Sequence, residues 1–117
     1  MAAETDCLFC RIAAGDVPAT LVHADDVLVA FRDIRPQAPT HVLLVPRRHI
    51  ASANDLAPED ADLVGRLVLS ARAIAAEQDL ATTGYRLVLN CGEWAGQTVH
   101  HLHLHLLGGR RLGWPPG

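Results

Sequence analysis

One segment of the chain alternates histidine with leucine: Val99-His100-His101-Leu102-His103-Leu104-His105-Leu106-Leu107. Side chains alternate along a β-strand, so a strand here would place His101, His103 and His105 on one face, each about 6.8 Å from the next. The leucines would occupy the other face, where they can pack against a helix. Histidines in register are costly to bury without partners, and such a density of titratable groups indicates a functional site.

Two kinds of site fit these histidines, a metal centre and a phosphate site. His-x-His on a strand can bind zinc, but hydrolytic zinc sites often add a carboxylate, and this segment has none. The preceding turn, Gly96-Gln97-Thr98, can aim backbone N–H groups and a hydroxyl at an oxyanion. Asn90 adds an amide and His41 a fourth imidazole. The surroundings therefore favour phosphate, with the metal centre as the alternative.

The rest of the chain predicts a single α+β domain over residues 1–117, in which an antiparallel sheet carries a helix on one face. Strands are expected at 20–23, 27–33, 41–46, 85–90 and 99–107. Asp6 is expected to cap a short helix over 7–14 that stops at Gly15. One long helix is expected over 58–78, where apolar residues recur at three- and four-residue steps.

Composition excludes several functions. The 117 residues carry a net charge of −3 and no lysine, so Schiff-base and P-loop lysine chemistry are excluded and a nucleic-acid partner is not expected. Residues 1–6 do not resemble a signal peptide, and no apolar run is long enough to span a membrane. With three cysteines, an odd number, we expect a reducing cytoplasmic location and no membrane partner.

Several motifs, in order along nearly the whole chain, resemble the histidine triad (HIT) family. The segment over 96–110 resembles its His-φ-His-φ-His-φ-φ signature, and the segments 31–34, 36–41 and 45–50 resemble its middle motifs. Gly84-Tyr85-Arg86 and Asn90 fit as well, and the tail Trp114-Pro115-Pro116-Gly117 resembles the branch of histidine triad nucleotide-binding proteins (HINT). The resemblance implies a HIT-like fold, a homodimer and a purine nucleoside phosphoramidase. Such an enzyme cleaves P–N bonds of nucleoside 5′-monophosphoramidates, and also acts on aminoacyl-adenylates, through a nucleotidyl-histidine.

The resemblance also assigns catalytic roles. His103 matches the nucleophile, which needs its other ring nitrogen held as a donor, for example by a backbone carbonyl. His105 and His41 match residues that contact the α-phosphate, and His101 matches an outer triad member that supports the nucleophile. Thr98, where serine is usual, matches a hydroxyl that assists the leaving amine.

The nucleotide site implied by the resemblance draws on most of the chain. Asp33 matches the carboxylate that accepts the ribose hydroxyls. The base walls match Leu8, Phe9, Ile12, Phe31, Ile34 and Leu43, which are otherwise ordinary core residues. Around the phosphate, the matching residues are Asn90, Gly96, Gln97, Thr98, Val99, His103 and His105. Trp114 matches a residue that enters the partner subunit's site, so the tail over 110–117 is expected to dock there.

Cys7-Leu8-Phe9-Cys10 is a CxxC motif that fits a redox pair, half of a metal site or two small apolar residues. By the resemblance, His49 and His101 would complete a structural zinc site that ties the N-terminal helix to the sheet. Catalysis would need no cofactor. Cys91 is expected to be an inert loop thiol.

Alternative functions remain open at this stage. The protein could be a nucleotide-binding regulator with incidental turnover or a dinucleoside polyphosphate hydrolase, although the Trp-Pro-Pro-Gly tail favours the phosphoramidase over the latter. A zinc hydrolase built on His101, His103 and His105 is a further alternative.

Overall fold

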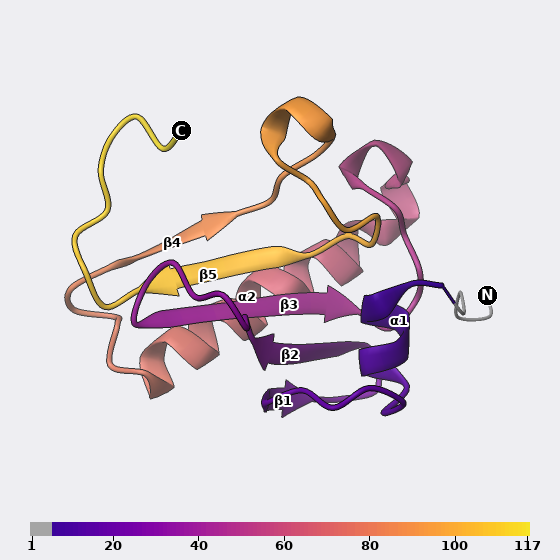
Figure 1. Cartoon of the computed structure of the whole chain (residues 1–117), viewed down its shortest axis with the longest axis horizontal. Coiled ribbons are helices and arrows are strands. Elements are labelled where there is room, and N and C mark those ends of the chain that lie inside the picture. The colour runs from indigo at the N-terminus through magenta and orange to yellow at the C-terminus, as the bar shows by residue number, and fades with distance from the viewer. Residues whose placement is uncertain (1–5) are drawn as a thin grey trace.

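The end of the histidine segment, from Leu104 on, belongs to a five-stranded antiparallel sheet (Figure 1), in a computed structural model that describes residues 6–117. The strands are β1 (Leu21–Ala24), β2 (Leu28–Arg32), β3 (Thr40–Pro46), β4 (Tyr85–Val88) and β5 (Leu104–Gly108). Their order across the sheet is β1-β2-β3-β5-β4, so β3 and β5 lie side by side at its centre. The two predictions that concern residues 1–5, the absence of a signal peptide and the start of the domain, lie outside the described residues.

The long helix α2 (Ala61–Glu77) covers one face of the sheet. A 3-10 turn, η2 (Pro58–Asp60), leads into it with proline at the first position, where a missing N–H costs nothing. Its buried residues Leu67, Ala71 and Ile74 pack against Leu44 of β3 and Leu106 of β5. Leu106, together with Leu102 and Leu104, forms the helix-facing leucine surface that the sequence predicts.

The short helix α1 (Leu8–Ala13) covers one end of the opposite face. Its Phe9 packs with Phe31 of β2 and Leu43 of β3 in a second apolar cluster. Central strand β3 therefore alternates: Val42 and Leu44 face α2, whereas Leu43 and Val45 face the side of α1. The predicted α+β class, with five antiparallel strands, one long helix and one short helix, is confirmed.

The predicted strand over 99–107 is wrong in extent, because β5 begins only at Leu104. The ladder between β3 and β5 ends at the pair of Leu44 with Leu104. Beyond it, Pro46 has no N–H to offer, and its carbonyl accepts a hydrogen bond from the ring of His101. The alternation of faces nevertheless continues outside the strand, since Leu102 belongs to the cluster under α2.

The predicted cap of the first helix is also wrong. Cys7, not Asp6, is the N-cap residue, and its Sγ accepts a hydrogen bond from the backbone N–H of Cys10 at 3.3 Å. The helix α2 begins three residues later than predicted, because residues 58–60 form the 3-10 turn η2. Apart from the start of β5, the other ends of the helices and strands differ from the prediction by at most two residues. Two further 3-10 turns, η1 (Ala53–Asp55) and η3 (Glu93–Ala95), lie in the loops that flank the histidine segment.

Within residues 6–117, none of the helices has both the length and the apolar character that crossing a bilayer would require.

Gly109 offers a test of how tightly β5 is fitted to its neighbours. Its φ is +93°, and a Cβ there would lie 2.9 Å from the Cβ of Pro39. We expect Gly109→Ala to lower the free energy of unfolding by about 1–3 kcal/mol, because it adds both backbone strain and a clash. Urea unfolding measures the change. Gly113→Ala is the matched control, since a Cβ at Gly113 meets no atom within 4 Å; equal stabilities of the two variants would contradict the prediction.

Candidate active site

His103 lies at the centre of the candidate site, just before β5, and is only 7% exposed. Its Nδ1 is 2.7 Å from the backbone oxygen of His101. A carbonyl oxygen can only accept, so Nδ1 carries the proton of this hydrogen bond. In the neutral ring, Nε2 then keeps its lone pair and can act as a nucleophile. The edge of Phe9 packs against the ring, with the two centroids 5.1 Å apart.

His41 and His105 form a second hydrogen-bonded unit beside His103. The backbone N–H of Gln37 donates to Nδ1 of His41 at 3.0 Å, so this nitrogen is the acceptor of the ring. Nε2 of His41 therefore carries the proton and donates to Nδ1 of His105 at 2.9 Å. His105 is left with its own proton on Nε2, and its ring centroid lies 5.0 Å from that of His103. A hydrogen-bond donor thus stands next to a nucleophile.

His41 is occupied by hydrogen bonds in this arrangement, and its predicted contact with phosphate stays a prediction. Both of its ring nitrogens already have partners, in Gln37 and His105. His41 is also 5% exposed, whereas His105 is half-buried. His41 therefore holds the ring of His105 in one orientation.

Burial keeps the imidazoles of His41 and His105 neutral near pH 7. Desolvation lowers the pKa of His105 to about 4, and repulsion by His103 and His41 lowers it further than the carboxylate of Asp33 raises it. Burial also lowers the pKa of His41, again against the opposing effect of Asp33. Near pH 7 His41 and His105 are therefore neutral hydrogen-bond donors beside His103.

The loop before the histidines differs from its predicted role as an anion-binding turn. The N–H of Gly96 donates to Glu93 and that of Gln97 to Gly92, so neither is available to an oxyanion. The buried side chain of Gln97 accepts from the N–H of Gly92 and donates to the carbonyls of Ala51 and Val99. Gln97 is thus a scaffold of this loop. The exposed Thr98 and the half-buried Asn90 remain as polar candidates near the site.

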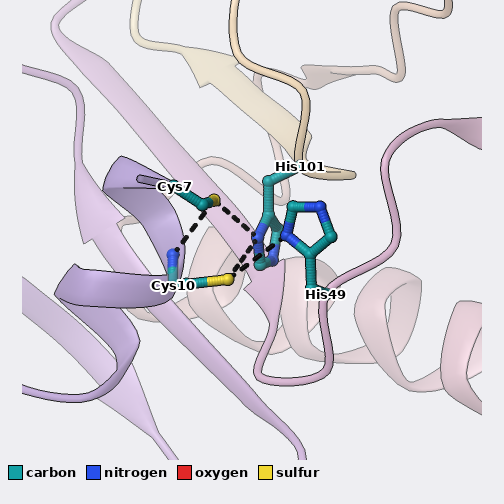
Figure 2. A group of neighbouring side chains, drawn as sticks. All are labelled: Cys7, Cys10, His49 and His101. Carbon is teal, nitrogen blue, oxygen red and sulfur yellow. Dashed lines mark hydrogen bonds between the residues drawn. The ribbon is translucent and has the colours of Figure 1, made fainter. Parts of the chain in front are cut away.

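Cys7, Cys10, His49 and His101 form a second cluster (Figure 2). Nδ1 of His101 lies 3.3 Å from Sγ of Cys7 and 3.4 Å from Sγ of Cys10, and Nδ1 of His49 lies 3.2 Å from Sγ of Cys10. All four ligand atoms lie within 4.8 Å of one another. Sulfur and nitrogen ligands of one tetrahedral zinc ion would stand about 3.5 Å apart, so the cluster has the size and chemistry of such a site.

The ring of His101 is oriented for this cluster. Its Nε2 donates to the carbonyl of Pro46 at 2.7 Å, which leaves the lone pair of Nδ1 directed at the two sulfurs. Metal-binding histidines are usually held by such a second hydrogen bond. His101 is fully buried, and burial lowers its pKa, which favours the neutral ring that a metal needs.

Comparison with known proteins places the chain among relatives. Residues 6–111 match the protein family described as "Scavenger mRNA decapping enzyme C-term binding". The solved structure of a HIT family hydrolase from Legionella pneumophila superposes with a TM-score of 0.95 at 52% identity, and the match covers 96% of this chain and 100% of that one. The chain belongs to the histidine triad family. The predicted family is thereby confirmed.

Other histidine triad relatives agree over almost the full length. An uncharacterized HIT-like protein of Synechococcus elongatus is 50% identical over 112 residues, which cover 96% of this chain and 97% of that protein. The purine nucleoside phosphoramidase of Escherichia coli K12 is 45% identical over 113 residues, covering 97% and 93% of the two chains. A histidine triad protein from Clostridium difficile has a TM-score of 0.93 at 42% identity, with 97% of each chain covered.

The remaining predicted site residues of this histidine triad protein fall into two groups. Phe9, Phe31 and Leu43 are buried, and Ile12 and Val99 pack against their cluster. Leu8, Ile34 and Trp114 are instead 44%, 91% and 85% exposed. The three exposed side chains are therefore not part of the core, and their roles remain predictions, as does the docking of the tail.

Asp33 lies at the edge of the His41–His105 unit. One carboxylate oxygen accepts from the N–H of Arg35 at 2.8 Å, and the other lies 3.5 Å from Nε2 of His41. The ligand atoms of Asp33, His41 and His105 are mutually close enough for a metal. However, the 2.9 Å separation of the two imidazole nitrogens is that of a hydrogen bond with a proton between them. The chemistry therefore favours a proton-linked unit at this position.

The alternative of a zinc hydrolase on His101, His103 and His105 does not fit this geometry. His101 directs Nδ1 at the cysteines, and His103 directs Nδ1 at the backbone carbonyl of His101. Among residues 6–117, the groups close enough to share a metal ion do not include His103.

The sequence does not reveal two backbone groups that orient the histidines, the carbonyl of Pro46 and the N–H of Gln37. Any residue type has such backbone groups, so no sequence pattern marks them.

The buried neutral histidines predict a loss of stability in acid. Unfolded histidines bind protons below about pH 6.5, whereas native His105 does so only near pH 4, so the free energy of unfolding falls as the pH drops between these values. Between pH 7 and 4.5, His105→Gln should lose about 2 kcal/mol less than the wild type. Urea unfolding over this pH range measures it, with the exposed His100→Gln as control. Parallel pH dependences for the wild type and His105→Gln would contradict the prediction.

Proposed function

We propose that this histidine triad protein is a hydrolase that acts through a covalent nucleotidyl-His103. It cleaves the P–N bond of purine nucleoside 5′-monophosphoramidates and, in aminoacyl-adenylates, the P–O bond between the phosphate and the aminoacyl group. The observation that carries the proposal is the hydrogen bond from Nδ1 of His103 to the carbonyl of His101, which leaves Nε2 as a nucleophile. The named activity of the E. coli relative at 45% identity supports the same chemistry.

In the proposed first step, Nε2 of His103 attacks phosphorus and forms a P–N bond with it, while the bond from phosphorus to the substrate amine breaks. The departing amine takes up a proton, for which the hydroxyl of exposed Thr98 is the proposed route. The carbonyl of His101 stabilises the charge that develops on the His103 ring. Water then attacks phosphorus, releases the nucleoside monophosphate and restores neutral His103.

The proposed phosphate contact is the Nε2–H of His105. His41 orients it, because the N–H of Gln37 fixes the His41 tautomer that donates to His105. The proposed nucleoside site places the ribose hydroxyls at Asp33 and the base along the cluster of Phe9, Phe31 and Leu43. Stacked apolar and aromatic walls suit a purine ring, adenine or guanine.

We further propose that the protein works as a cytoplasmic homodimer. Trp114 is 85% exposed in a chain that has only two tryptophans, one tyrosine and two phenylalanines. Exposure of so large an aromatic group favours a tail that docks on a second copy. In the proposed dimer, Trp114 reaches the partner's nucleotide site, as the family resemblance implies.

Hydrolysis of adenosine 5′-monophosphoramidate tests the function. We expect the wild type to release AMP and His103→Ala to lose at least about a thousandfold in kcat, because the nucleophile is gone. His23→Ala is the matched control, since His23 is an exposed histidine paired with Asp25 on β1, away from the site. Intact-protein mass spectrometry of a rapidly quenched wild-type reaction should show an adenylyl adduct at His103.

Three results would overturn the proposal. Nucleotide binding by a folded wild type without turnover would favour the nucleotide-binding regulator. Preferred cleavage of a dinucleoside polyphosphate would favour that class of hydrolase. Equal rates for His103→Ala and His23→Ala would exclude catalysis by His103.

We also propose a structural zinc ion held by Cys7, Cys10, His49 and His101. The support is the fit of the donor set, two thiols and two imidazole nitrogens within 4.8 Å of one another. Zinc there would cross-link α1 to the segments that carry His49 and His101, without taking part in the reaction.

Metal content tests the zinc proposal. We expect the purified wild type to hold one zinc ion per chain and Cys7→Ser to hold much less, because a hydroxyl is a poor ligand for zinc. Elemental analysis after dialysis gives the ratio. Cys91→Ser is the control, since Cys91 lies outside the cluster; retention of zinc by Cys7→Ser would refute the assigned ligands.

A further inference from the structure

His101 takes part in both clusters, and this double position has a functional consequence. Its ring faces the two thiols through Nδ1, and its backbone oxygen accepts the hydrogen bond that fixes the ring of His103. Ring and carbonyl belong to one residue that is fully buried. A change that moves the ring toward or away from the thiols therefore also moves the acceptor on which the nucleophile depends.

On one side, hydrogen bonds hold His101 and Leu102 to the segment 46–50. The ring donates to the carbonyl of Pro46, and the next residue, Leu102, donates its N–H to the carbonyl of Ile50 at 2.6 Å. His49 lies between these two acceptors in the chain, and neighbouring Arg48 pairs with Asp60 at the start of α2. The segment 46–50 is therefore a fixed support against which His101 is held.

On its other side, the ring of His101 contacts residues of α1 and its N-cap, so its position depends on this helix. This helix has six residues, too few to be stable without tertiary contacts. Phe9 lies between the two cysteines and packs edge-on against both His101 and His103, with centroid separations of 6.1 Å and 5.1 Å. The anchoring of Cys7 and Cys10 thus also decides how firmly Phe9 holds the nucleophile.

We propose that occupancy of the Cys7–Cys10–His49–His101 cluster by a thiophilic ion such as Zn²⁺ controls the orientation of His103, with His101 as the positioning residue between the two sites. With the cluster linked, α1 and the segment 46–50 hold His101 between them, and its carbonyl keeps Nδ1–H of His103 in place. Without the link, α1 loosens, and the carbonyl and Phe9 no longer fix one ring orientation. The proposal rests on the proposed function only in naming His103 as the nucleophile.

The first experiment observes His103 directly, without substrate. Side-chain ¹⁵N and ¹³C NMR at one fixed pH compares the zinc-loaded wild type with the same protein after chelation and dialysis. We expect one sharp set of Nδ1–H signals for His103 when loaded, and broadened or shifted signals after chelation. Failure to bind zinc, or identical His103 signals in the two states, would overturn the proposal.

The second experiment separates positioning from a general loss of structure. On chelation we expect kcat for adenosine 5′-monophosphoramidate to fall at least about tenfold, because small misplacements of a reacting group are costly, while KM changes by less than about twofold. Circular dichroism should show the sheet and α2 intact. Equal falls in affinity and turnover, or an unchanged kcat, would count against positioning.

Variants check that the effect comes from the cluster. Cys7→Ser keeps an N-cap acceptor for α1 but loses the soft ligand, so it should reproduce the metal-free His103 signals even with zinc present. Cys91→Ser should behave as the wild type. Absence of turnover in both metal states, together with a metal-dependent His103 signal, would refute the phosphoramidase function and leave the coupling supported. Normal turnover in both states with unchanged signals would refute the coupling alone.

Discussion

The hydrogen bond from His103 to the carbonyl of His101 is the interaction on which the site depends. It selects one of two tautomers and so decides which nitrogen is free. The acceptor is a backbone group just outside β5, where the ladder with β3 has ended, so the sheet itself does not hold it. Its position comes instead from the ring contacts of His101, the bond from Leu102 to Ile50 and the packing of α1.

The two different faces of the sheet explain how the fold accommodates His41, His101, His103 and His105. On one side, Leu102, Leu104 and Leu106 enter the core under α2 and contribute apolar burial. On the other side, each histidine satisfies at least one nitrogen through a carbonyl, an amide or another imidazole. The cost of burying polar rings is thereby offset locally, next to a core that supplies the stability.

Much of this fold follows from the order of residue types along the chain. The alternation of histidine and leucine predicts the faces of residues 101–106, and the three- and four-residue steps over 58–78 predict α2. The end of the strand at Leu104 does not follow from such patterns, because it depends on Pro46 and on a ring contact from a distant segment. The site shows the same limit, since no sequence pattern indicates that the side chain of Gln97 hydrogen-bonds the backbone of Gly92, Val99 and the distant Ala51.

The neutral imidazoles of His41 and His105 also affect how readily a charged ligand leaves the site. The phosphorus centre of a phosphoramidate carries a single negative charge, whereas the monophosphate product carries between one and two near pH 7, since its second ionisation lies near pH 6. His105 offers a dipole and no full positive charge, and the carboxylate of Asp33 stands nearby. Such a pocket attracts the more highly charged product weakly, so in the proposed reaction release of the monophosphate would follow readily on hydrolysis of the bond to His103.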